Sequence, residues 1–278
     1  MQKQRFSHPF SPSQTGLLLL SLLLTGFTVT PDLTFGSVLT FHSNLSIHFE
    51  EKPRDTLQWN RPRFSERGQE RAYLVETGII GQGITDPAVI EAMLNVPRHR
   101  FIPESEQRFA YLNQPLPIGF NQTISQPYIV ALMAEILEVQ PGQKVLEIGT
   151  GSGYHAAVLS ELTPAVFTIE IVEPLGERAA ALYRELGYAT IEVRIGDGYK
   201  GWPEQAPFDR ILVTAAADSV PQPLIDQLAP GGIIVMPVGD PADTQILTRL
   251  IKTEEGEIRT ERVVPVRFVP LTREEEQP

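Results

Sequence analysis

The feature that most constrains the fold of this chain is an apolar segment that runs directly into a glycine-rich turn. In residues 145–159, VLEIGTGSGYHAAVL, glycine occupies every second position at Gly149, Gly151 and Gly153. Glycine allows the positive φ angles of a sharp turn and lets a ligand lie against the backbone without meeting a Cβ atom. The segment therefore predicts a strand, a tight turn that holds a ligand, and a helix.

Short apolar strands alternate with helical segments after this turn. Continuous apolar strands separated by helices are typical of a parallel sheet that is covered on both faces. We therefore expect an α/β fold with a doubly wound, mostly parallel sheet. The expected strands cover residues 144–148, 166–169, 191–195, 208–213 and 233–238, and the expected helices cover 153–162, 174–186 and 221–229.

The two ends of this domain follow other patterns. Residues 244–270 alternate around a Glu-Glu-Gly-Glu turn, which predicts an antiparallel C-terminal hairpin added to the sheet. Ahead of the glycine turn we expect an N-terminal helical extension. Its first helix starts with Pro87 after Asp86, and its second has Ser125 or Gln126 as the N-cap, followed by a proline. The second helix has an apolar face made of Ile129, Val130, Leu132, Met133, Ile136 and Leu137.

Residues 1–35 have the composition of an export signal or a short membrane anchor. Lys3 and Arg5 precede an uncharged segment, residues 16–30, which is a little shorter than the roughly 20 residues of a spanning helix. A start codon placed too far upstream would produce the same sequence. Residues 36–70 are polar and resemble a linker. Residues 71–278 are expected to form the catalytic domain, with its cofactor core at about 139–240.

Composition excludes several classes of function. The net charge is -11 and there is no local basic stripe, so we expect no nucleic-acid partner. The chain has no cysteine, which excludes disulfides, thiolate nucleophiles and cysteine-based zinc sites. Its five histidines are scattered without a metal-ligand spacing, so we expect no metal.

The glycine turn does not match the dinucleotide fingerprint. That fingerprint needs a glycine where this chain has Tyr154. No basic residue lies between Glu147 and Tyr154, so a pyrophosphate would find no cation there. The Glu147 carboxylate would repel a pyrophosphate and is better suited to a ligand with an amino group and a sulfonium.

Two further acidic residues follow neighbouring strands. Glu170 ends the next strand, where a carboxylate can accept hydrogen bonds from both ribose hydroxyls. Asp197 and Gly198 end the third strand, in a place suited to an adenine amino group. The carboxyl edge of a doubly wound sheet is its usual ligand crevice. Together with the glycine turn, these residues favour S-adenosyl-L-methionine as the cofactor.

Several separated motifs resemble those of the protein-L-isoaspartate (D-aspartate) O-methyltransferase family. The resemblance extends from Val75 to Thr272, and its most specific parts are TISQPY and the closing VRFVPL. The chain departs from the family at Asn121, where glycine is usual, and in its N-terminal leader. The other motifs are VPRHRFIPE, VLEIGTGSGYHAAVL, GDGYKGWPEQAPFDRILVTAAA and LAPGGIIVMPVG.

The resemblance implies an enzyme that transfers a methyl group from S-adenosyl-L-methionine to the free α-carboxylate of L-isoaspartyl residues in damaged proteins. The ester then collapses to a succinimide, which hydrolyses partly to normal aspartate. By family match, Ser125 is the active-site serine. The implied cofactor residues are Glu147, Gly149, Gly151, Glu170, Asp197 and Gly198, and the implied substrate residues are Thr123, Ile124, Arg267, Phe268, Val269 and Pro270. The resemblance also implies a cytoplasmic protein, and we expect a monomer.

The chemistry of this reaction fits the residues. An α-carboxyl group has a pKa of about 3.5, so the attacking carboxylate is already ionised at neutral pH and needs no strong base. Methyl transfer requires the carboxylate oxygen in line with the bond between sulfur and methyl. Ser125 is therefore expected to orient the carboxylate as a hydrogen-bond donor rather than to act as a nucleophile, and it would also suit the N-cap of its helix.

Three other functions stay open at the level of the sequence. One is a methyltransferase of the same fold that acts on a small carboxylic acid. The second is an NAD-dependent oxidoreductase, and the third is an exported, non-catalytic binding protein. Location is equally open, because residues 16–30 indicate export or membrane anchoring whereas the resemblance indicates the cytoplasm.

Overall fold

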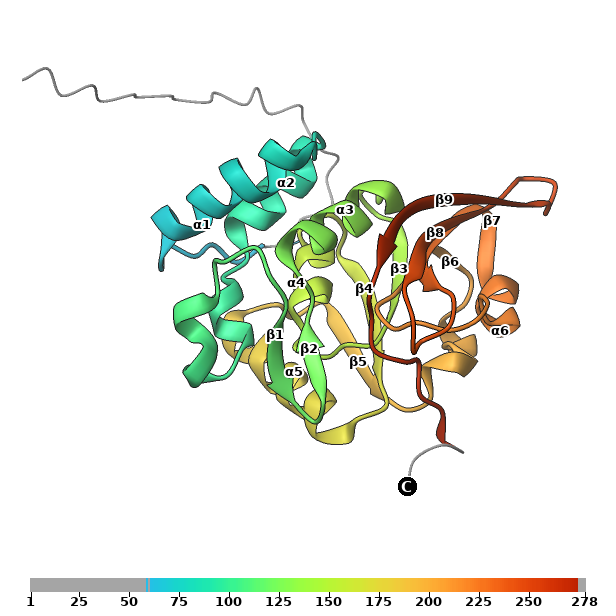
Figure 1. The fold of residues 1–278 in the computed structure, drawn as a ribbon. Helices are drawn as coiled ribbons and strands as arrows, with labels where there is room; N and C mark the ends of the chain where they lie inside the picture. The colour runs from blue at the N-terminus through green and yellow to red at the C-terminus, as the bar shows by residue number, and fades with distance from the viewer. Residues whose placement is uncertain (1–58, 60, 275–278) are drawn as a thin grey trace, which may run out of the picture. The chain divides into compact units, whose positions relative to one another are not determined.

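A seven-stranded sheet forms the centre of the domain, with the strand order β5-β4-β3-β6-β7-β8-β9 (Figure 1). The computed structural model describes residues 59 and 61–274. The first five strands in this order are parallel, and β8 and β9 continue the sheet as an antiparallel hairpin. The strands are β3 (Lys144–Ile148), β4 (Ala165–Glu170), β5 (Ile191–Ile195), β6 (Phe208–Val213), β7 (Leu228–Val238), β8 (Gln245–Lys252) and β9 (Ile258–Val266).

The helices and a small second sheet surround these strands. The small sheet is a hairpin of β1 (Leu116–Gly119) and β2 (Gln122–Ile124). The α-helices are α1 (Gly68–Leu74), α2 (Pro87–Asn95), α3 (Pro127–Leu137), α4 (Tyr154–Ser160), α5 (Glu173–Leu186) and α6 (Gln222–Asp226). The shorter turns are a π-helix, η1 (Val75–Ile79), and the 3-10 helices η2 (Ile80–Gln82), η3 (Arg98–Phe101), η4 (Glu104–Phe109), η5 (Gly198–Lys200) and η6 (Pro203–Gln205).

The predicted fold class is confirmed, and so is the C-terminal hairpin. The prediction is wrong for residues 221–229, where only Gln222–Asp226 are helical. The chain enters β7 at Leu228, which pairs with Phe208 of the neighbouring β6. Backbone pairing with a central strand therefore overrides the helical pattern in this stretch.

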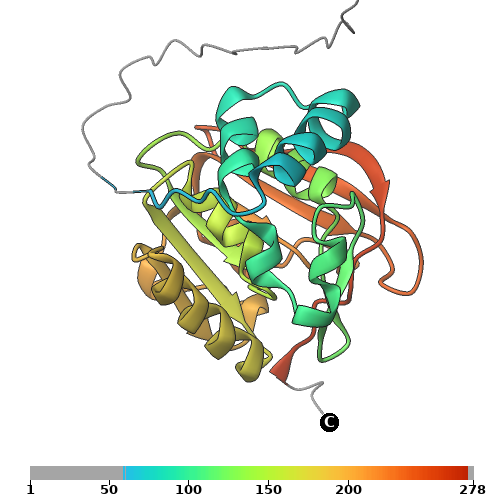
Figure 2. The ribbon, with the colours of Figure 1, turned by 90° about the vertical axis from the view of Figure 1, so that its left-hand side faces the viewer.

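The two faces of the sheet have separate hydrophobic cores, one larger than the other. The larger core packs helices α2 to α5 onto one face, and Val145 and Val235 belong to it. The smaller core lies on the other face, where Trp202 and Leu224 from the region of η6 and α6 cover Ile148. Figure 2 shows α5 lying along the edge of the sheet formed by β5 and β4. Successive strand residues point to opposite faces, so each continuous apolar strand contributes to both cores.

The sequence explains where the first long helix begins. The Asp86 carboxylate, at the N-cap of α2, accepts hydrogen bonds from the amides of Ala88 at 2.7 Å and Val89 at 3.2 Å. Pro87 occupies the first turn, where its missing N–H is not needed. The carboxylate of Glu135 on α3 accepts from the Asp86 amide at 2.7 Å, which links the two helices.

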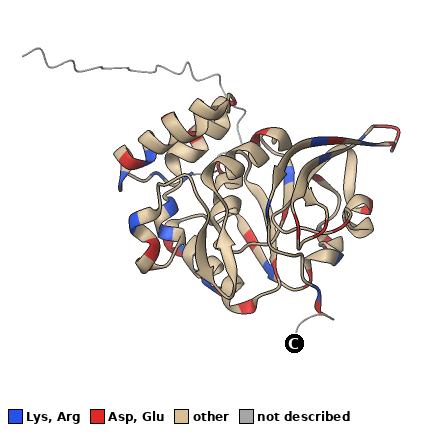
Figure 3. Ribbon diagram, viewed as in Figure 1, with Lys and Arg blue, Asp and Glu red and all other residues tan. Residues whose placement is uncertain are grey.

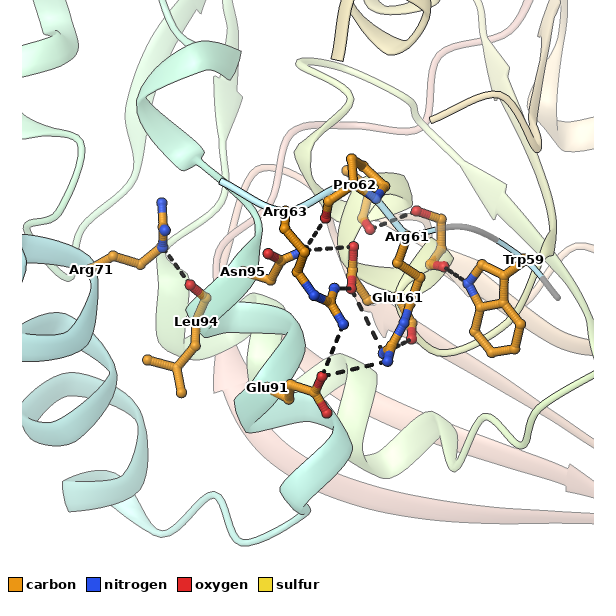
Figure 4. Close-up of polar contacts among 11 residues, drawn as sticks. Trp59, Arg61, Pro62, Arg63, Arg71, Glu91, Leu94, Asn95 and Glu161 are labelled. Carbon is orange, nitrogen blue, oxygen red and sulfur yellow. Dashed lines mark hydrogen bonds and ion pairs between the residues drawn. The ribbon is translucent and has the colours of Figure 1, made fainter. Parts of the chain in front are cut away.

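Residues at the end of the predicted linker pack against the domain (Figure 4). The Trp59 indole donates to the backbone oxygen of Ser160 at 3.0 Å. Arg63 pairs at 3.0 Å with the carboxylate of Glu161, whose side chain is fully buried, and Arg61 lies 3.8 Å from the same carboxylate. Asn95 of α2 also donates to Glu161, at 2.8 Å. Trp59, Arg61 and Arg63, which lie ahead of the predicted boundary at residue 71, therefore contact the rest of the domain.

The leader, residues 1–35, and residues 36–58 of the predicted linker lie outside the described residues. Among the helices that the structure describes, none is both long enough and apolar enough to cross a membrane.

The glycine turn after β3 supplies a test of the packing. Gly153 has a φ of 89°, and an added Cβ atom would lie 2.7 Å from the hydroxyl oxygen of Tyr183. Gly256 has a similar φ of 86° but nothing within 4 Å of the same position. We expect Gly153→Ala to lower the free energy of unfolding by about 2 to 4 kcal/mol, through backbone strain and a clash, and Gly256→Ala by only about 1 kcal/mol. Denaturant unfolding of both variants measures the difference, and equal losses would contradict it.

Candidate active site

Two cavities meet at the carboxyl ends of the central strands. The first lies over the ends of β3, β4 and β6 and has an empty volume of about 790 Å³, with the solvent at its mouth included. The second lies beside it and is bordered by the start of α3 and the segment after β9. Both cavities are lined by Thr123, Ser125, Thr214 and Val269. The order of the sheet reverses between β3 and β6, which is where open α/β sheets usually bind their ligands.

The glycine turn forms the floor of the first cavity. Gly149, with a φ of 93°, approaches Thr214 so closely that an added Cβ atom would lie 2.4 Å from its hydroxyl oxygen. Thr214 donates to the backbone oxygen of Gly149 at 2.7 Å, which fixes the turn against the end of β6. At Gly151, which has a φ of 54°, an added Cβ atom would lie 3.6 Å from Ile118, an ordinary van der Waals contact, so the positive φ rather than a clash favours glycine there.

Glu170 stands at the wall of the same cavity. Its carboxylate accepts hydrogen bonds from the amide of Gly151 at 2.6 Å and from that of Val172 at 2.9 Å. These bonds lower the pKa of the carboxyl group, but burial has the larger effect and raises it overall. Two carboxylate oxygens offer about four acceptor positions, so Glu170 retains capacity for a ligand hydroxyl. Of the predicted cofactor residues, the cavity is lined by Gly149, Gly151, Glu170 and Gly198.

Glu147 does not line the cavity, and its side chain is fully buried behind the glycine turn. One oxygen accepts from the hydroxyl of Thr168 at 2.6 Å, and that hydroxyl lies 2.6 Å from the hydroxyl of Thr150 in the glycine turn. The other oxygen, Oε1, has no hydrogen-bond partner among the described residues. Burial raises the pKa of the Glu147 carboxyl to about 8, with the nearby Glu170 adding to the effect. Because Glu147 is not among the residues that line the cavity, its contact with a cofactor stays a prediction.

Asp197 is likewise turned away from the cavity. Its side chain is 2 % exposed, and one oxygen accepts from the amide of Tyr199 at 2.9 Å, which caps the short helix η5. The neighbouring Gly198 lines the cavity instead. An added Cβ atom at Gly198 would lie 2.4 Å from Ile148, so this glycine lets the loop pack closely on β3.

Ser125 lies where the two cavities join, and its hydroxyl makes no hydrogen bond to any described residue. Of the two predicted N-caps of α3, Gln126 is confirmed as the N-cap position and Ser125 is wrong. The Gln126 side chain makes no cap bond, and the side-chain oxygen of Asn113 instead accepts from the Tyr128 amide at 3.0 Å. A residue from a distant loop therefore satisfies the helix start and leaves the serine hydroxyl free to meet a ligand.

The predicted substrate residues lie on opposite sides of the second cavity. Thr123 comes from β2, and Arg267, Phe268 and Val269 come from the segment after β9. Arg267 is the one charged residue among those lining this cavity. The C-terminal segment is held by Ala216, whose amide donates to Val269 and whose oxygen accepts from Leu271, both at 2.8 Å. Ile124 and Pro270 line the first cavity.

Two residues at the site were missed by the sequence analysis. Thr214 lines both cavities; it directly follows the predicted strand 208–213, but its place beside the glycine turn depends on which strands become neighbours. His155 also lines the first cavity, in the first turn of α4. Neither of its ring nitrogens has a partner among the described residues, and burial lowers its pKa to about 3. The ring is therefore neutral at physiological pH.

Comparison with known proteins now places the chain. Residues 70–276 match the model of the protein-L-isoaspartate(D-aspartate) O-methyltransferase family. The chain belongs to this family. The protein-L-isoaspartate O-methyltransferase of Opitutus terrae is 55% identical over 75% of this chain and 89% of its own length. That of Gloeobacter violaceus is 54% identical over 73% of this chain and 99% of its own length.

Solved structures of the same family have the same fold. The Plasmodium falciparum beta-aspartate methyltransferase, in complex with S-adenosyl-L-homocysteine, aligns with a TM-score of 0.64 and 26% identity, over 73% of this chain and 98% of that one. A second protein-L-isoaspartate O-methyltransferase aligns with a TM-score of 0.66 and 29% identity, over 72% of this chain and 65% of that one. Membership of a methyltransferase family excludes the alternative of an NAD-dependent oxidoreductase.

The buried Glu147 of this methyltransferase makes folding stability depend on pH. The folded protein holds the proton of this carboxyl up to about pH 8, whereas the unfolded chain releases it near the ordinary value of 4.5. The folded state thus binds more protons between these values, so the contribution of Glu147 to stability falls as pH rises, by up to about 1.4 kcal/mol per pH unit.

We expect Glu147→Gln to remove this contribution. The free energy of unfolding of the variant, minus that of the parent, should increase from pH 5 to pH 8 and level off above. Urea unfolding without ligand at pH 5 to 9 measures this difference. A difference that does not change with pH would mean that Glu147 is ionised in the folded protein.

Proposed function

We propose that this protein methylates isoaspartyl carboxylates at the junction of the two cavities, with Ser125 as the residue that orients the carboxylate. The observation that supports this most directly is the place of the Ser125 hydroxyl. It lines both the glycine-floored cavity and the cavity next to the C-terminal segment, and it has no partner among the described residues. A hydroxyl in this position can meet a substrate in one cavity beside a methyl donor in the other.

The first cavity fits S-adenosyl-L-methionine. When bound, this cofactor supplies an electrophilic methyl group on a sulfonium. Gly149 and Gly151 line this cavity without side chains, so a ligand can lie against their backbone, and Glu170 provides acceptor oxygens at the wall. We propose Gly149, Gly151, Glu170 and Gly198 as direct cofactor contacts. Glu147 and Asp197 support the same contacts from behind, through Thr168 and through the cap of η5.

The second cavity fits the peptide substrate. Its lining is mostly uncharged, and Arg267 at its rim offers a cation to an approaching carboxylate. Thr123, Ile124 and the segment from Arg267 to Pro270 are proposed to contact the peptide. Edge pairing of an extended peptide with this segment would supply main-chain hydrogen bonds. Because the substrate carboxylate is already ionised, this chain needs to align it and exclude water rather than remove a proton.

Replacement of Ser125 tests its proposed role. We expect Ser125→Ala to lower kcat/KM for an isoaspartyl peptide by roughly 10- to 100-fold, because one hydrogen bond to a charged group is lost. The Kd for S-adenosyl-L-homocysteine should change less than threefold. Ser160→Ala is a matched control, because Ser160 is buried in α4 and donates to Ala157 at 2.8 Å, outside both cavities. Equal activity of Ser125→Ala and the parent would remove the serine from the mechanism.

The substrate class is tested with methyl-labelled S-adenosyl-L-methionine. An isoaspartyl peptide should be labelled, and its aspartyl twin, whose carboxylate lies one methylene further from the main chain, should not. Labelling of small carboxylic acids in preference to the isoaspartyl peptide would support the alternative small-molecule methyltransferase. Cofactor binding without any labelling would support the non-catalytic binding protein.

We further propose that the protein is a cytoplasmic monomer whose catalytic domain does not bind nucleic acid. Lys and Arg residues are interspersed with Asp and Glu residues along the described ribbon in Figure 3, and the sequence carries a net charge of -11, which suits neither a DNA duplex nor an anionic membrane. Residues 1–35 remain the alternative basis for export or anchoring. Mass spectrometry of the native N-terminus decides whether this leader is present, cleaved or retained.

A further inference from the structure

The segment that carries the proposed substrate residues continues beyond the end of the sheet ladder. The pairing of β8 with β9 ends at Gln245 and Val266. Arg267, Phe268 and Val269 follow immediately and line the second cavity, opposite Thr123 and Ser125. A wall of a binding site that is not part of a ladder needs other hydrogen bonds to fix its position.

One buried side chain supplies these bonds. Gln245 is 1 % exposed, and its amide oxygen accepts from the Phe268 amide at 2.9 Å. Its amide nitrogen donates to the backbone oxygens of Asp240 at 3.0 Å and Asp243 at 2.7 Å. The side chain thus joins the loop between β7 and β8 to the substrate segment, and every bond that it makes is to the backbone.

Both segments joined by Gln245 reach the second cavity. Thr244, the last residue of the loop, lines the same cavity as Phe268. The far end of the substrate segment is held separately, by the two bonds between Ala216 and the backbone of Val269 and Leu271. The segment is therefore fixed at two points: Gln245 bonds to Phe268, and Ala216 bonds to Val269 and Leu271. Gln245 itself lines neither cavity.

We propose that Gln245 is a positioning residue that sets the substrate-facing wall of the second cavity at its working distance from Ser125. This inference rests on the proposed function of the site. The buried amide replaces the ladder bonds that β9 no longer makes after Val266, and it fixes the backbone to which an isoaspartyl peptide would bind. The cofactor cavity has its own supports, so a loss of Gln245 should affect the peptide and not the cofactor.

The test compares Gln245→Leu with the parent in the full-length protein. Leucine keeps most of the volume and removes all three hydrogen bonds. We expect KM for the isoaspartyl peptide to rise roughly tenfold or more, with kcat reduced less and the Kd for S-adenosyl-L-homocysteine changed less than twofold. Hydrogen exchange at the Phe268 amide should become at least tenfold faster.

Gln227→Leu is the matched control. Gln227 is also buried and also bonds only to the backbone, accepting from Trp202 at 2.7 Å and donating to Lys200 at 2.9 Å, but it lines neither cavity. The Gln227→Leu variant should be less stable than the parent, while its KM for the peptide stays within twofold of the parent value. If Gln245→Leu does not fold, Gln245→Glu replaces it. The carboxylate still accepts from Phe268 but cannot donate to the loop, so an increase in KM of a few fold is expected.

The outcomes separate this inference from the proposed function. An unchanged peptide KM in a folded Gln245 variant, or an equal rise in the Gln227 control, would overturn the positioning role while leaving the function intact. If the parent labels no isoaspartyl peptide, the proposed function itself fails. In that case, unchanged exchange at the Phe268 amide in the variant would also refute the structural part of the inference.

Discussion

The close approach of Gly149 to Thr214 is the contact on which the rest of the site depends. It brings the turn after β3 against the end of β6, at the point where the strand order of the sheet reverses. Only a residue without a Cβ atom fits there, because an added Cβ would lie 2.4 Å from the threonine hydroxyl oxygen. Thr214 lines both cavities together with Ser125 and with Val269 of the C-terminal segment, so this contact lies where the parts of the site meet.

Polar side chains around the cavities hold their walls in position. The buried Thr150, Thr168 and Glu147 form a chain of hydrogen bonds beneath the glycine turn, and the half-buried Asn113 caps the helix that follows Ser125. Gln245 plays the corresponding part for the C-terminal wall. Buried polar groups of this kind are costly unless they are satisfied, so each one specifies a single local arrangement. The residues expected to meet the ligand are thus supported by others that do not touch it.

The sequence was sufficient for the fold class, because periodicity and glycine spacing are local signals. It was insufficient wherever a side chain bonds to a distant segment. The cap from Asn113, the enclosure of Glu147 and the position of Thr214 all depend on which strands become neighbours. The contacts of Arg61 and Arg63 could not be predicted for the same reason, since this polar stretch resembles a linker until its buried partner Glu161 is known.

Trp59, Arg61 and Arg63 form an N-terminal arm that contacts the domain outside the two cavities, which matters for anything attached ahead of it. Trp59 bonds to Ser160 at the last turn of α4, whereas the first turn of that helix follows the glycine turn at the cavity. The helix rises by about 1.5 Å per residue, so roughly 10 Å of rigid backbone separates the arm from the reaction centre. A leader, an affinity tag or a solid support joined before residue 59 would be attached near the C-terminal end of this helix, away from its first turn at the cavity. Immobilisation through the N-terminus should therefore leave the mouth of the site accessible to large, damaged protein substrates.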